Sequence, residues 1–384
     1  MRATKAIIHL ENFKHNIKEI RSFTKPGVKM CIPVKADAYG HGSIECAKAA
    51  LEAGVEFLAV AAVEEGVELR EAGIKGRILL FSLASPEEIH DAVKADLTPF
   101  VFDEEYIDMF AKEALRQGKK SYPVHLAVDT GMGRIGCYAK DAASLAKHIA
   151  DTGILFHEGT MTHFATSDGK SPADCEYTKK QFEEFKSAIK GIEEAGLSAG
   201  ICHCANSAAT LDLSETHMDM VRPGIIVYGY DADEVNSEYL AKKGTPINLK
   251  PVMTLETEVC AIRPFKKGMS VGYGRTWIAE EDTDIALLPI GYGDGFLRRF
   301  AQNGIKVAIK GKAYPVRGRI CMDQCMVDIG KDNKEIQRWD KAVIFGCKED
   351  GALQTADDIA KLTGTISYEI TTVLTRRVPR EFRS

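Results

Sequence analysis

Short runs rich in β-branched residues alternate with stretches of helical periodicity through the first two thirds of the chain, and this alternation limits the fold more than any other feature. Eight runs predict strands, at residues 29–34, 56–61, 77–82, 98–102, 123–128, 156–162, 200–204 and 217–221. The helical stretches between them are residues 44–53, 63–72, 86–95, 104–117, 142–152 and 174–195. Eight strands that are each followed by a helix are the number found in a (β/α)₈ barrel, so the sequence predicts an α/β fold with that barrel.

A doubly wound open sheet is the competing fold for this alternation. That fold places a glycine-rich fingerprint directly after its first strand. Here the first strand is followed by Lys35-Ala36-Asp37-Ala38-Tyr39, which lacks the fingerprint. The barrel is therefore favoured.

The pattern of apolar residues changes near Leu240, where helical periodicity fades. One helix is predicted at 355–362, with Thr355 as its N-cap. The short strands expected in this part, separated by turns that contain glycine, are residues 252–262, 284–289, 306–309 and 342–345. We therefore expect a barrel domain over residues 1–240 and a mainly β C-terminal domain over residues 241–384, with the segment before about residue 10 as a candidate strand of the second domain.

The overall charge and the cysteines limit the partners and the compartment. A net charge of −5 and a pI near 6.1 argue against nucleic acid or an anionic membrane as the main partner. No apolar run approaches a membrane span, and the apolar stretch before His9 is too short for a secretory signal. The ten cysteines follow no regular spacing, so we expect reduced thiols in the cytoplasm.

Cys202-His203-Cys204 is the stretch that most invites interpretation as a metal site. Alternation in a strand would place the two cysteines on one face and the histidine on the other. We expect no metal site there.

Reactive groups in a (β/α)₈ barrel lie at the carboxyl ends of the strands. Lys35 comes directly after the first strand. Burial at the barrel mouth lowers the pKa of a lysine amine, and a lysine that forms a Schiff base needs that uncharged form. The position of Lys35 supports equally well a second interpretation, in which the lysine side chain reaches solvent from the strand end.

The loop after the fifth strand and the end of the sixth strand carry two further candidates. Glycines surround Arg134 in the loop at 129–136, as expected of a loop that closes on an anionic ligand. His163 ends the sixth strand, where its ring could stack on an aromatic cofactor. The ordinary alternatives are a flexible loop with a solvated arginine and a histidine that serves only the structure, which is the commoner case.

The last two strand ends predict a phosphorylated ligand. Asn206 and Ser207 follow the seventh strand, and Arg222, Gly224 and Ile225 follow the eighth. Barrels commonly bind phosphate in these two loops through backbone N–H groups. Ser207 offers a hydroxyl, and Gly224 lets the main chain approach a ligand, although the glycine could serve turn geometry alone.

Polar motifs also gather in the second domain. Tyr273 and Tyr292 each stand between glycines, and Arg319, Asp323 and Tyr368 lie in short polar segments. A tyrosine on such a turn is usually a surface or packing residue. Several polar motifs in one domain predict instead that it forms half of an active site.

The chain resembles bacterial alanine racemases, which are pyridoxal 5′-phosphate (PLP) enzymes, over essentially its whole length. Residues 34–42 are similar to the cofactor-lysine signature of that family, and the other motifs follow in order. The resemblance implies an enzyme that interconverts L-alanine and D-alanine, with PLP on Lys35. It also implies a homodimer, in which Tyr273 enters the partner's site as the second catalytic base.

The resemblance assigns roles to the other candidates as well. Arg222 would face the pyridine nitrogen, and Arg134 would contact the cofactor and, with the backbone of Met322, the substrate carboxylate. The residues implied to surround the cofactor are Tyr39, Arg134, His163, Asn206, Ser207, Arg222, Gly224, Ile225 and Tyr368. The residues implied to line the channel for substrate are Tyr292, Arg298, Arg319 and Asp323.

The chemistry of racemisation explains these residue types. Proton removal on one face of a planar intermediate and return on the other need two groups on opposite sides. Lys35 would serve one face, and Tyr273 the other, as a phenolate that neighbouring cations stabilise. PLP enzymes often place a carboxylate at the ring nitrogen. Arg222 would leave that nitrogen unprotonated, which weakens the electron sink and favours racemisation over decarboxylation or transamination.

One position departs from the family pattern. Many members have a lysine two residues before the Asp-Thr-Gly-Met-Gly motif, where it becomes carboxylated and holds the nearby arginine. That position is Ala127 here. Arg134 must then be oriented by another anion, by a bound ion such as chloride, or by neutral hydrogen bonds.

Three other functions compete with alanine racemisation. A serine racemase is the nearest, because an apolar pocket rejects an added hydroxyl poorly, and we expect some activity on serine in any case. Tyr368 resembles the alanine-specific pattern. A decarboxylase on the same scaffold would carry a carboxylate in place of Arg222, and a non-catalytic PLP-binding protein would lack the second domain with Tyr273. The physiological role could be D-alanine supply for peptidoglycan or D-alanine catabolism.

Overall fold

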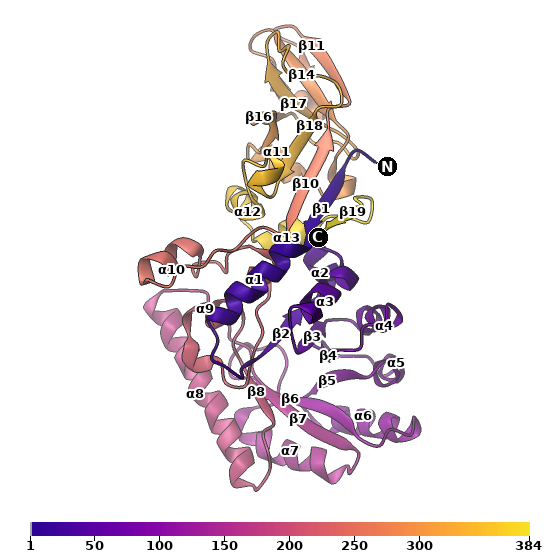
Figure 1. Cartoon of the computed structure of the whole chain (residues 1–384), viewed down its shortest axis with the longest axis vertical. Coiled ribbons are helices and arrows are strands. Elements are labelled where there is room, and N and C mark those ends of the chain that lie inside the picture. The colour runs from indigo at the N-terminus through magenta and orange to yellow at the C-terminus, as the bar shows by residue number, and fades with distance from the viewer. Residues whose placement is uncertain (1) are drawn as a thin grey trace.

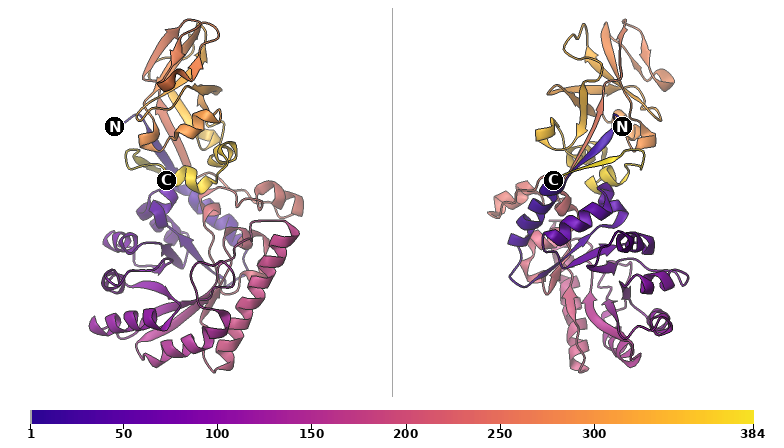
Figure 2. Two further views of the ribbon diagram at one scale, coloured as in Figure 1. Left: turned by 180° about the vertical axis from the view of Figure 1, so that it is seen from behind. Right: turned by 45° about the vertical axis from the view of Figure 1, so that its right-hand side comes forward.

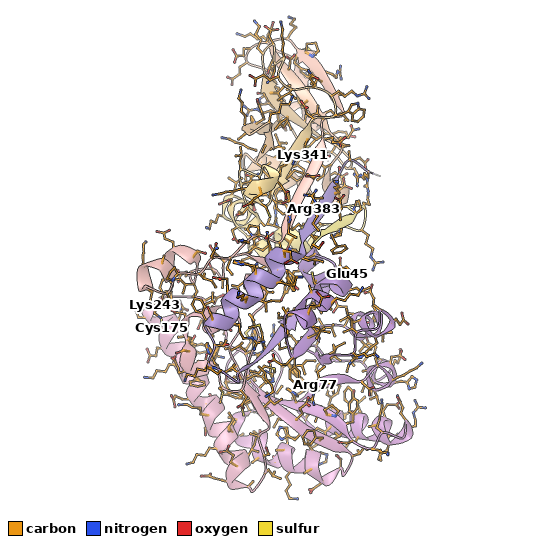
Figure 3. All side chains as sticks on the ribbon, in the orientation of Figure 1. Glu45, Arg77, Cys175, Lys243, Lys341 and Arg383 are labelled. Carbon is orange, nitrogen blue, oxygen red and sulfur yellow. The ribbon has the colours of Figure 1, made fainter. Side chains whose placement is uncertain are left out.

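The structure, a computed structural model, describes residues 2–384. A barrel of strands and helices forms the lower half of the molecule in Figure 1, and a mainly β domain forms the upper half. Figure 2 shows the same division from behind and in an oblique view. In Figure 3, Arg77 and Cys175 mark the barrel, and Lys341 marks the C-terminal domain.

Eight parallel strands form the barrel. Their order follows the chain, and β9 returns to lie beside β2. The strands are β2 (Lys29–Pro33), β3 (Phe57–Val60), β4 (Arg77–Leu80), β5 (Leu97–Val101), β6 (Tyr122–Ala127), β7 (Leu155–Met161), β8 (Ile201–His203) and β9 (Met220–Val221). Backbone hydrogen bonds from Asp219 N to Cys202 O (3.1 Å) and from Arg222 N to Ala205 O (2.8 Å) bring the ends of the sheet together. The predicted (β/α)₈ barrel is confirmed.

Helices surround the barrel. They are α1 (Leu10–Ser22), α2 (Lys35–Gly40), α3 (Ser43–Glu52), α4 (Val63–Glu71), α5 (Ile89–Lys94), α6 (Glu104–Arg116), α7 (Ala142–Asp151), α8 (Pro172–Glu194), α9 (Ser207–Asp212) and α10 (Ser237–Lys243), with short 3₁₀ helices η1 (Ala139–Asp141), η2 (Ser214–Thr216) and η3 (Ile225–Tyr228). The six predicted helices correspond to α3–α8. The sequence did not predict α1, in which Asn16 Nδ2 donates to Val227 O (3.0 Å) and so joins α1 to η3. Over the described residues, no helix is both long and apolar enough to cross a bilayer.

A nine-stranded sheet forms the C-terminal domain, in the order β11-β14-β17-β16-β15-β18-β10-β1-β19. Its strands are β1 (Lys5–His9), β10 (Met253–Glu258), β11 (Ala261–Phe265), β14 (Thr283–Leu288), β15 (Lys306–Ile309), β16 (Lys312–Arg317), β17 (Cys325–Gly330), β18 (Lys341–Phe345) and β19 (Arg380–Arg383). The smaller elements are β12 (Ser270–Val271), β13 (Trp277–Ile278), α11 (Arg298–Gln302), α12 (Ala356–Thr363), α13 (Ser367–Thr372), η4 (Tyr273–Arg275), η5 (Tyr292–Asp294) and η6 (Lys348–Asp350). Strand β1 pairs with β10 and β19, so the first strand of the chain belongs to this sheet.

Two details of the C-terminal prediction have different outcomes. The predicted helix is α12, and Thr355 is its N-cap, which accepts from Asp358 N (3.3 Å). The single strand predicted at 252–262 is wrong, because the chain forms β10 and β11 at different places in the sheet. Val259 N donates to Asp340 O and Cys260 N to Leu287 O, so consecutive residues bond to different neighbours and the strand breaks there.

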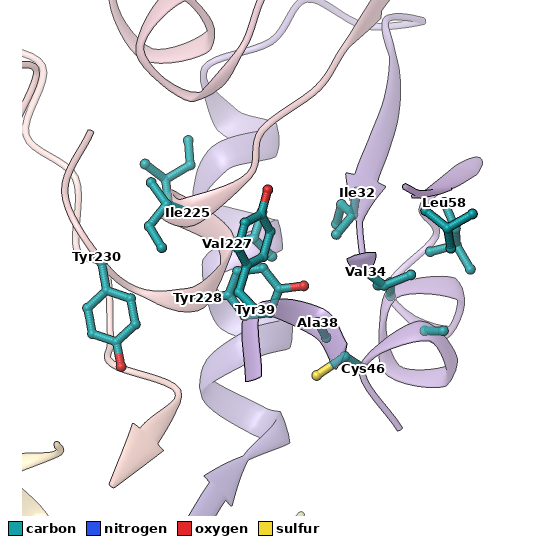
Figure 4. Packing of buried hydrophobic residues seen from close by; sticks show 14 of the residues in the cluster. Ile32, Val34, Ala38, Tyr39, Cys46, Leu58, Ile225, Val227, Tyr228 and Tyr230 are labelled. Carbon is teal, nitrogen blue, oxygen red and sulfur yellow. The ribbon is translucent and has the colours of Figure 1, made fainter. Parts of the chain in front are cut away.

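One apolar core holds the first and last strands of the barrel together. Ile32 and Val34 from the first strand region pack in it with Ile225 from η3 (Figure 4). The Tyr39 and Tyr228 rings meet edge to face, with centroids 5.0 Å apart. This core fixes the loops that follow β2 and β9 relative to one another.

Candidate active site

One large cavity, of about 520 Å³, opens at the carboxyl ends of the barrel strands. The predicted cofactor residues that line it are Lys35, Tyr39, Arg134, His163, Asn206, Ser207, Arg222, Gly224 and Tyr368. Ile225 follows Gly224 and is fully buried. These residues come from five strand ends and from α13, so the barrel and the C-terminal domain build the cavity together.

A left-handed turn carries the lysine. Residues 36–39 have φ values between 51° and 53°. This conformation costs L-residues roughly 1–2 kcal/mol each, so surrounding contacts must hold it. Glu65 Oε1 accepts a hydrogen bond from Ala36 N (2.6 Å), and Asp37 Oδ1 accepts one from the first N–H of α3 (2.9 Å). These bonds fix the direction in which Lys35 leaves the strand.

The surroundings of Lys35 favour its uncharged form. Burial lowers the pKa of the amine, and the Arg134 guanidinium lowers it further. Glu65 acts in the opposite direction on the same pKa. An uncharged amine is the form that attacks a carbonyl carbon. The lowered pKa agrees with the reactive amine that the sequence predicts, and Lys35 as the cofactor lysine stays a prediction.

Hydroxyl groups and a backbone amide converge in one corner of the cavity. Gly224 N donates to Ser207 Oγ (2.8 Å), and Asn206 Oδ1 caps α9 by accepting a backbone N–H (3.1 Å). A Cβ at Gly224 would lie 3.2 Å from Tyr39 Oη and 3.6 Å from Ser207 Oγ, so glycine keeps this corner open. The Tyr368 ring meets the Tyr39 ring edge-on, with centroids 5.4 Å apart. Such a set of N–H and O–H donors suits phosphate oxygens.

Arg222 is 4% exposed and is held by hydrogen bonds. Its Nη1 donates to His203 Nδ1 (2.6 Å), and its Nη2 donates to Thr162 O (2.8 Å) and His163 Nδ1 (3.2 Å). Burial lowers the pKa of Arg222 to about 10, so the side chain remains charged at neutral pH. Burial and then the charge of Arg222 lower the pKa of His163 to about 3, which leaves this histidine neutral and able to accept.

The Arg134 loop folds back on the end of β6. Asp129 Oδ1 accepts hydrogen bonds from two glycine N–H groups of the loop, at 2.9 and 3.0 Å. Arg134 itself is exposed and borders the cavity. The carboxylate therefore shapes the loop and leaves the guanidinium facing the open side.

The other predicted residues do not line this cavity. They are Tyr273, Tyr292, Arg298, Arg319, Met322 and Asp323, all in the C-terminal domain. Tyr273 is 70% exposed and Met322 is 52% exposed. Gly293, next to Tyr292, donates its N–H to Met322 O (2.9 Å). Gly274, next to Tyr273, lies so close to Arg319 that a Cβ at residue 274 would be 3.1 Å from Arg319 Nη1.

These contacts gather the turns of Tyr273 and Tyr292 around the segment 319–323, and we call this group the C-terminal patch. Arg298 is exposed at the start of α11, shortly after η5. A single chain thus brings the patch together but does not carry it to Lys35.

Two family models match the chain: "Alanine racemase, N-terminal domain" over residues 8–232 and "Alanine racemase, C-terminal domain" over residues 252–382. An alanine racemase of Treponema denticola is 49% identical over 385 aligned residues, which cover 100% of this chain and 98% of that protein. The chain belongs to the alanine racemase family. The alanine racemase of Clostridium difficile 630 matches the structure with a TM-score of 0.90 at 36% identity, covering 100% of this chain and 96% of that one. The alanine racemase of Bacillus anthracis with bound L-Ala-P gives a TM-score of 0.90 at 34% identity, again covering 100% and 96%.

Residue 127 of this member of the alanine racemase family is the position where the resemblance implies a carboxylated lysine in many members, and here it is an alanine. Ala127 is fully buried in an apolar cluster that includes Phe100 and Met161. A carboxylated lysine therefore does not hold Arg134. The family models leave residues 233–251 between them, and the domain boundary between residues 240 and 241 stays a prediction.

Several residues in or next to the cavity were not predicted from the sequence. Glu65 is one of them, and the left-handed conformation of residues 36–39, which Glu65 contacts, was not predicted either. Glu65 lies in the first turn of α4, just after β3, so a search for carboxylates at strand ends would have found it. Five aspartates also line the cavity: Asp129, Asp168, Asp231, Asp233 and Asp357.

Proposed function

We propose that this protein is a PLP-dependent enzyme that interconverts L-alanine and D-alanine. The observation that carries the proposal is the Lys35 amine, whose pKa is lowered, in a cavity that also contains Arg222 and the hydroxyl groups around Gly224. Membership of the alanine racemase family supports the same activity.

The donors in the cavity fit PLP. Tyr39, Ser207, Tyr368 and the N–H groups at Gly224 and Ile225 would hold its phosphate, in the corner that a Cβ at residue 224 would fill. Lys35 would bond to the cofactor covalently. When bound, PLP draws electrons from the Cα of an amino acid and makes the Cα–H bond acidic.

We assign the two proton transfers to Lys35 and to Tyr273 of the partner subunit. Lys35 Nζ would take or return the Cα proton on one face of the substrate, and the tyrosine hydroxyl would do so on the other. Within one chain Tyr273 is 70% exposed and does not line the cavity, so a second copy must supply it. A homodimer with shared active sites follows from this assignment.

Arg222 would set the type of reaction. It offers only donors, and its pKa of about 10 keeps it charged. At the ring nitrogen it would therefore limit how much charge the ring draws from Cα, which disfavours transamination and decarboxylation. His163 would lie beside the ring.

The C-terminal patch would complete the site on the substrate side. Arg134 and the backbone of Met322 would hold the substrate carboxylate. The channel through which substrate enters would be lined by Tyr292, Arg298, Arg319 and Asp323.

Alanine is the substrate that we propose, and the L-Ala-P bound to the Bacillus anthracis relative supports a ligand of that size. Serine adds one hydroxyl, which an apolar pocket rejects poorly, so we expect a side activity on it. The ten cysteines are all unpaired, which supports a reducing compartment such as the cytoplasm. The enzyme would supply D-alanine for peptidoglycan or catabolise it.

Chiral chromatography tests the proposal. The purified protein is incubated with PLP and L-alanine, and D-alanine is expected to accumulate until the two enantiomers are equal. Borohydride is used in parallel to trap PLP on Lys35. Trapped cofactor without D-alanine would contradict the racemase assignment, and release of CO₂ would indicate a decarboxylase.

A further inference from the structure

A line of buried polar side chains runs from Arg222 to the opposite end of the barrel. His203 Nδ1 lies 2.6 Å from Arg222 Nη1, His203 Nε2 lies 2.8 Å from His125 Nδ1, and His125 Nε2 lies 3.3 Å from Glu158 Oε2. Both histidines are fully buried, and Glu158 is 5% exposed. Glu158 also pairs with Arg77, the first residue of β4, which is labelled in Figure 3. The line therefore connects the cavity to the amino-terminal end of the strands.

Only one arrangement of protons satisfies this line. Arginine has no acceptor, so His203 Nδ1 must accept and the proton of this ring lies on Nε2. His203 Nε2–H then donates to His125 Nδ1, which places the proton of His125 on its Nε2, facing Glu158. An ionised carboxylate can only accept, so the far end of the line demands the same arrangement.

Burial keeps both histidines neutral, as this arrangement requires. It lowers the pKa of His125 to about 3, with the neighbouring His157 and Arg222 as smaller causes. Burial and the charge of Arg222 hold the pKa of His203 well below its usual value. Neither ring can therefore take up a second proton near neutral pH.

The backbone is shaped to bring Glu158 and His125 together. Val124 pairs with His157 whereas His125 pairs with Gly159, so Glu158 is an extra residue in β7. Such a β-bulge redirects a side chain. A Cβ at Gly159 would come within 2.7 Å of the His125 ring, so the glycine leaves room for that ring. Two irregularities of β7 thus serve the same contact.

We propose that Glu158 and His125 are positioning residues for Arg222. They fix the protons of both histidines, so that His203 always offers an acceptor to Arg222 and the guanidinium stays directed at the cavity. Without Glu158, a proton moved to His125 Nδ1 would face the N–H of His203. This inference rests on the proposed function, in which Arg222 faces the ring nitrogen of the cofactor.

Three variants separate this role from a general structural one. Glu158→Leu removes the acceptor, whereas Glu158→Gln keeps an acceptor oxygen without the charge. Asp350→Leu is the matched control, because Asp350 is also largely buried and pairs with a histidine and an arginine, His9 (2.7 Å) and Arg383 (3.2 Å).

The first measurement is ¹⁵N NMR of the histidine side chains in the cofactor-free protein. We expect His125 and His203 to be neutral with the proton on Nε2 in the wild type, in Glu158→Gln and in Asp350→Leu, and this pattern to be lost in Glu158→Leu. A proton on Nδ1 of either wild-type ring overturns the proposal, so the test stands even if Glu158→Leu does not fold.

The second measurement is racemisation kinetics of the PLP-loaded proteins. We expect kcat of Glu158→Leu to fall about tenfold, as when a buried donor loses its acceptor, with little change in KM for alanine. Glu158→Gln should recover most of kcat, and Asp350→Leu should keep it. Equal losses in Glu158→Leu and Asp350→Leu, or no loss in either, would overturn the proposal. A wild type that does not racemise alanine would contradict the proposed function instead, while the NMR pattern still tests the line itself.

Discussion

The barrel mouth and the C-terminal patch differ in how completely one chain builds them. At the mouth, nine predicted cofactor residues line one cavity, and Arg222 is locked by hydrogen bonds at 4% exposure. In the patch, Tyr273 is 70% exposed and no residue reaches that cavity. Folding of a single chain therefore fixes the proposed cofactor half of the site, whereas in the proposed homodimer a second chain would supply the other half.

Lys35→Ala should break the cofactor half and have the largest effect. We expect loss of all measurable racemisation, because Lys361, the other lysine that lines the cavity, lies on α12 and not at a strand end. The visible absorption of PLP bonded to lysine should disappear as well. Lys29→Ala, at the other end of the same strand, is the control and should retain both. Full activity in Lys35→Ala would mean that another residue carries the cofactor.

Tyr273→Phe should break the second half alone. The variant removes one hydroxyl from an exposed side chain, so we expect PLP binding to remain and proton loss from L-alanine to fall about 10³-fold. Uptake of deuterium from solvent into L-alanine measures that step. Tyr138→Phe is the matched control, since Tyr138 is 69% exposed on the barrel. Normal deuterium uptake in Tyr273→Phe would refute its role as a base.

Gly224→Ala sharpens the description of the cofactor half. The added Cβ would lie 3.2 Å from Tyr39 Oη, in the corner assigned to the phosphate. We expect affinity for PLP to fall about tenfold, because a hydrogen bond to a charged group is lost. Titration with PLP, followed by absorbance, measures the change. Gly191→Ala in α8, where no atom lies within 4 Å of the new Cβ, should bind PLP normally, and equal affinities in the two variants would refute the phosphate corner.

Asp357→Asn probes a contact between the barrel domain and the C-terminal domain, beside the cavity, and should have the smallest effect. Asp357 Oδ2 accepts from Asp231 N (3.1 Å), and burial raises the pKa of Asp357 to about 6. The folded state thus favours the protonated carboxyl. The protonated Asp357 carboxyl therefore contributes fully to the stability of the fold below about pH 4, and this contribution is lost as the pH rises through about 6.

Because Asn is neutral at every pH, we expect Tm of Asp357→Asn to exceed that of the wild type by about 2 °C at pH 8 and by nothing at pH 4. Thermal unfolding at both pH values checks this. Asp151→Asn, at an exposed carboxylate, should show no such pH-dependent difference. An equal Tm difference at pH 4 and pH 8 in Asp357→Asn would contradict the account.

The sequence predicts the barrel and most of the cofactor half because both depend on local patterns. Each strand is a short apolar run, and the rule that reactive groups follow the strands leads directly to Lys35 and Arg222. The sequence did not predict that the strand breaks at Val259, between β10 and β11. Apolar periodicity does not indicate where a chain stops pairing with one strand and starts pairing with another.

Contacts between distant residues account for the rest of what the sequence did not predict. The left-handed turn after Lys35 depends on Glu65 in the next helix. His125 contacts Glu158 and His203, which are 33 and 78 residues further along the chain. Nothing in the local sequence at His125 indicates either partner, so such a line becomes visible only in the folded barrel.

Subunit complementation tests the division into two half-sites most directly. Lys35→Ala and Tyr273→Phe chains are expressed together with different tags, and the mixed dimer is purified on both tags. A two-fold dimer then contains one site with both mutations and one site with neither. We predict that each homodimer is inactive and that the mixed dimer has about half of the wild-type racemase activity. A mixed dimer as inactive as the homodimers would contradict the shared site.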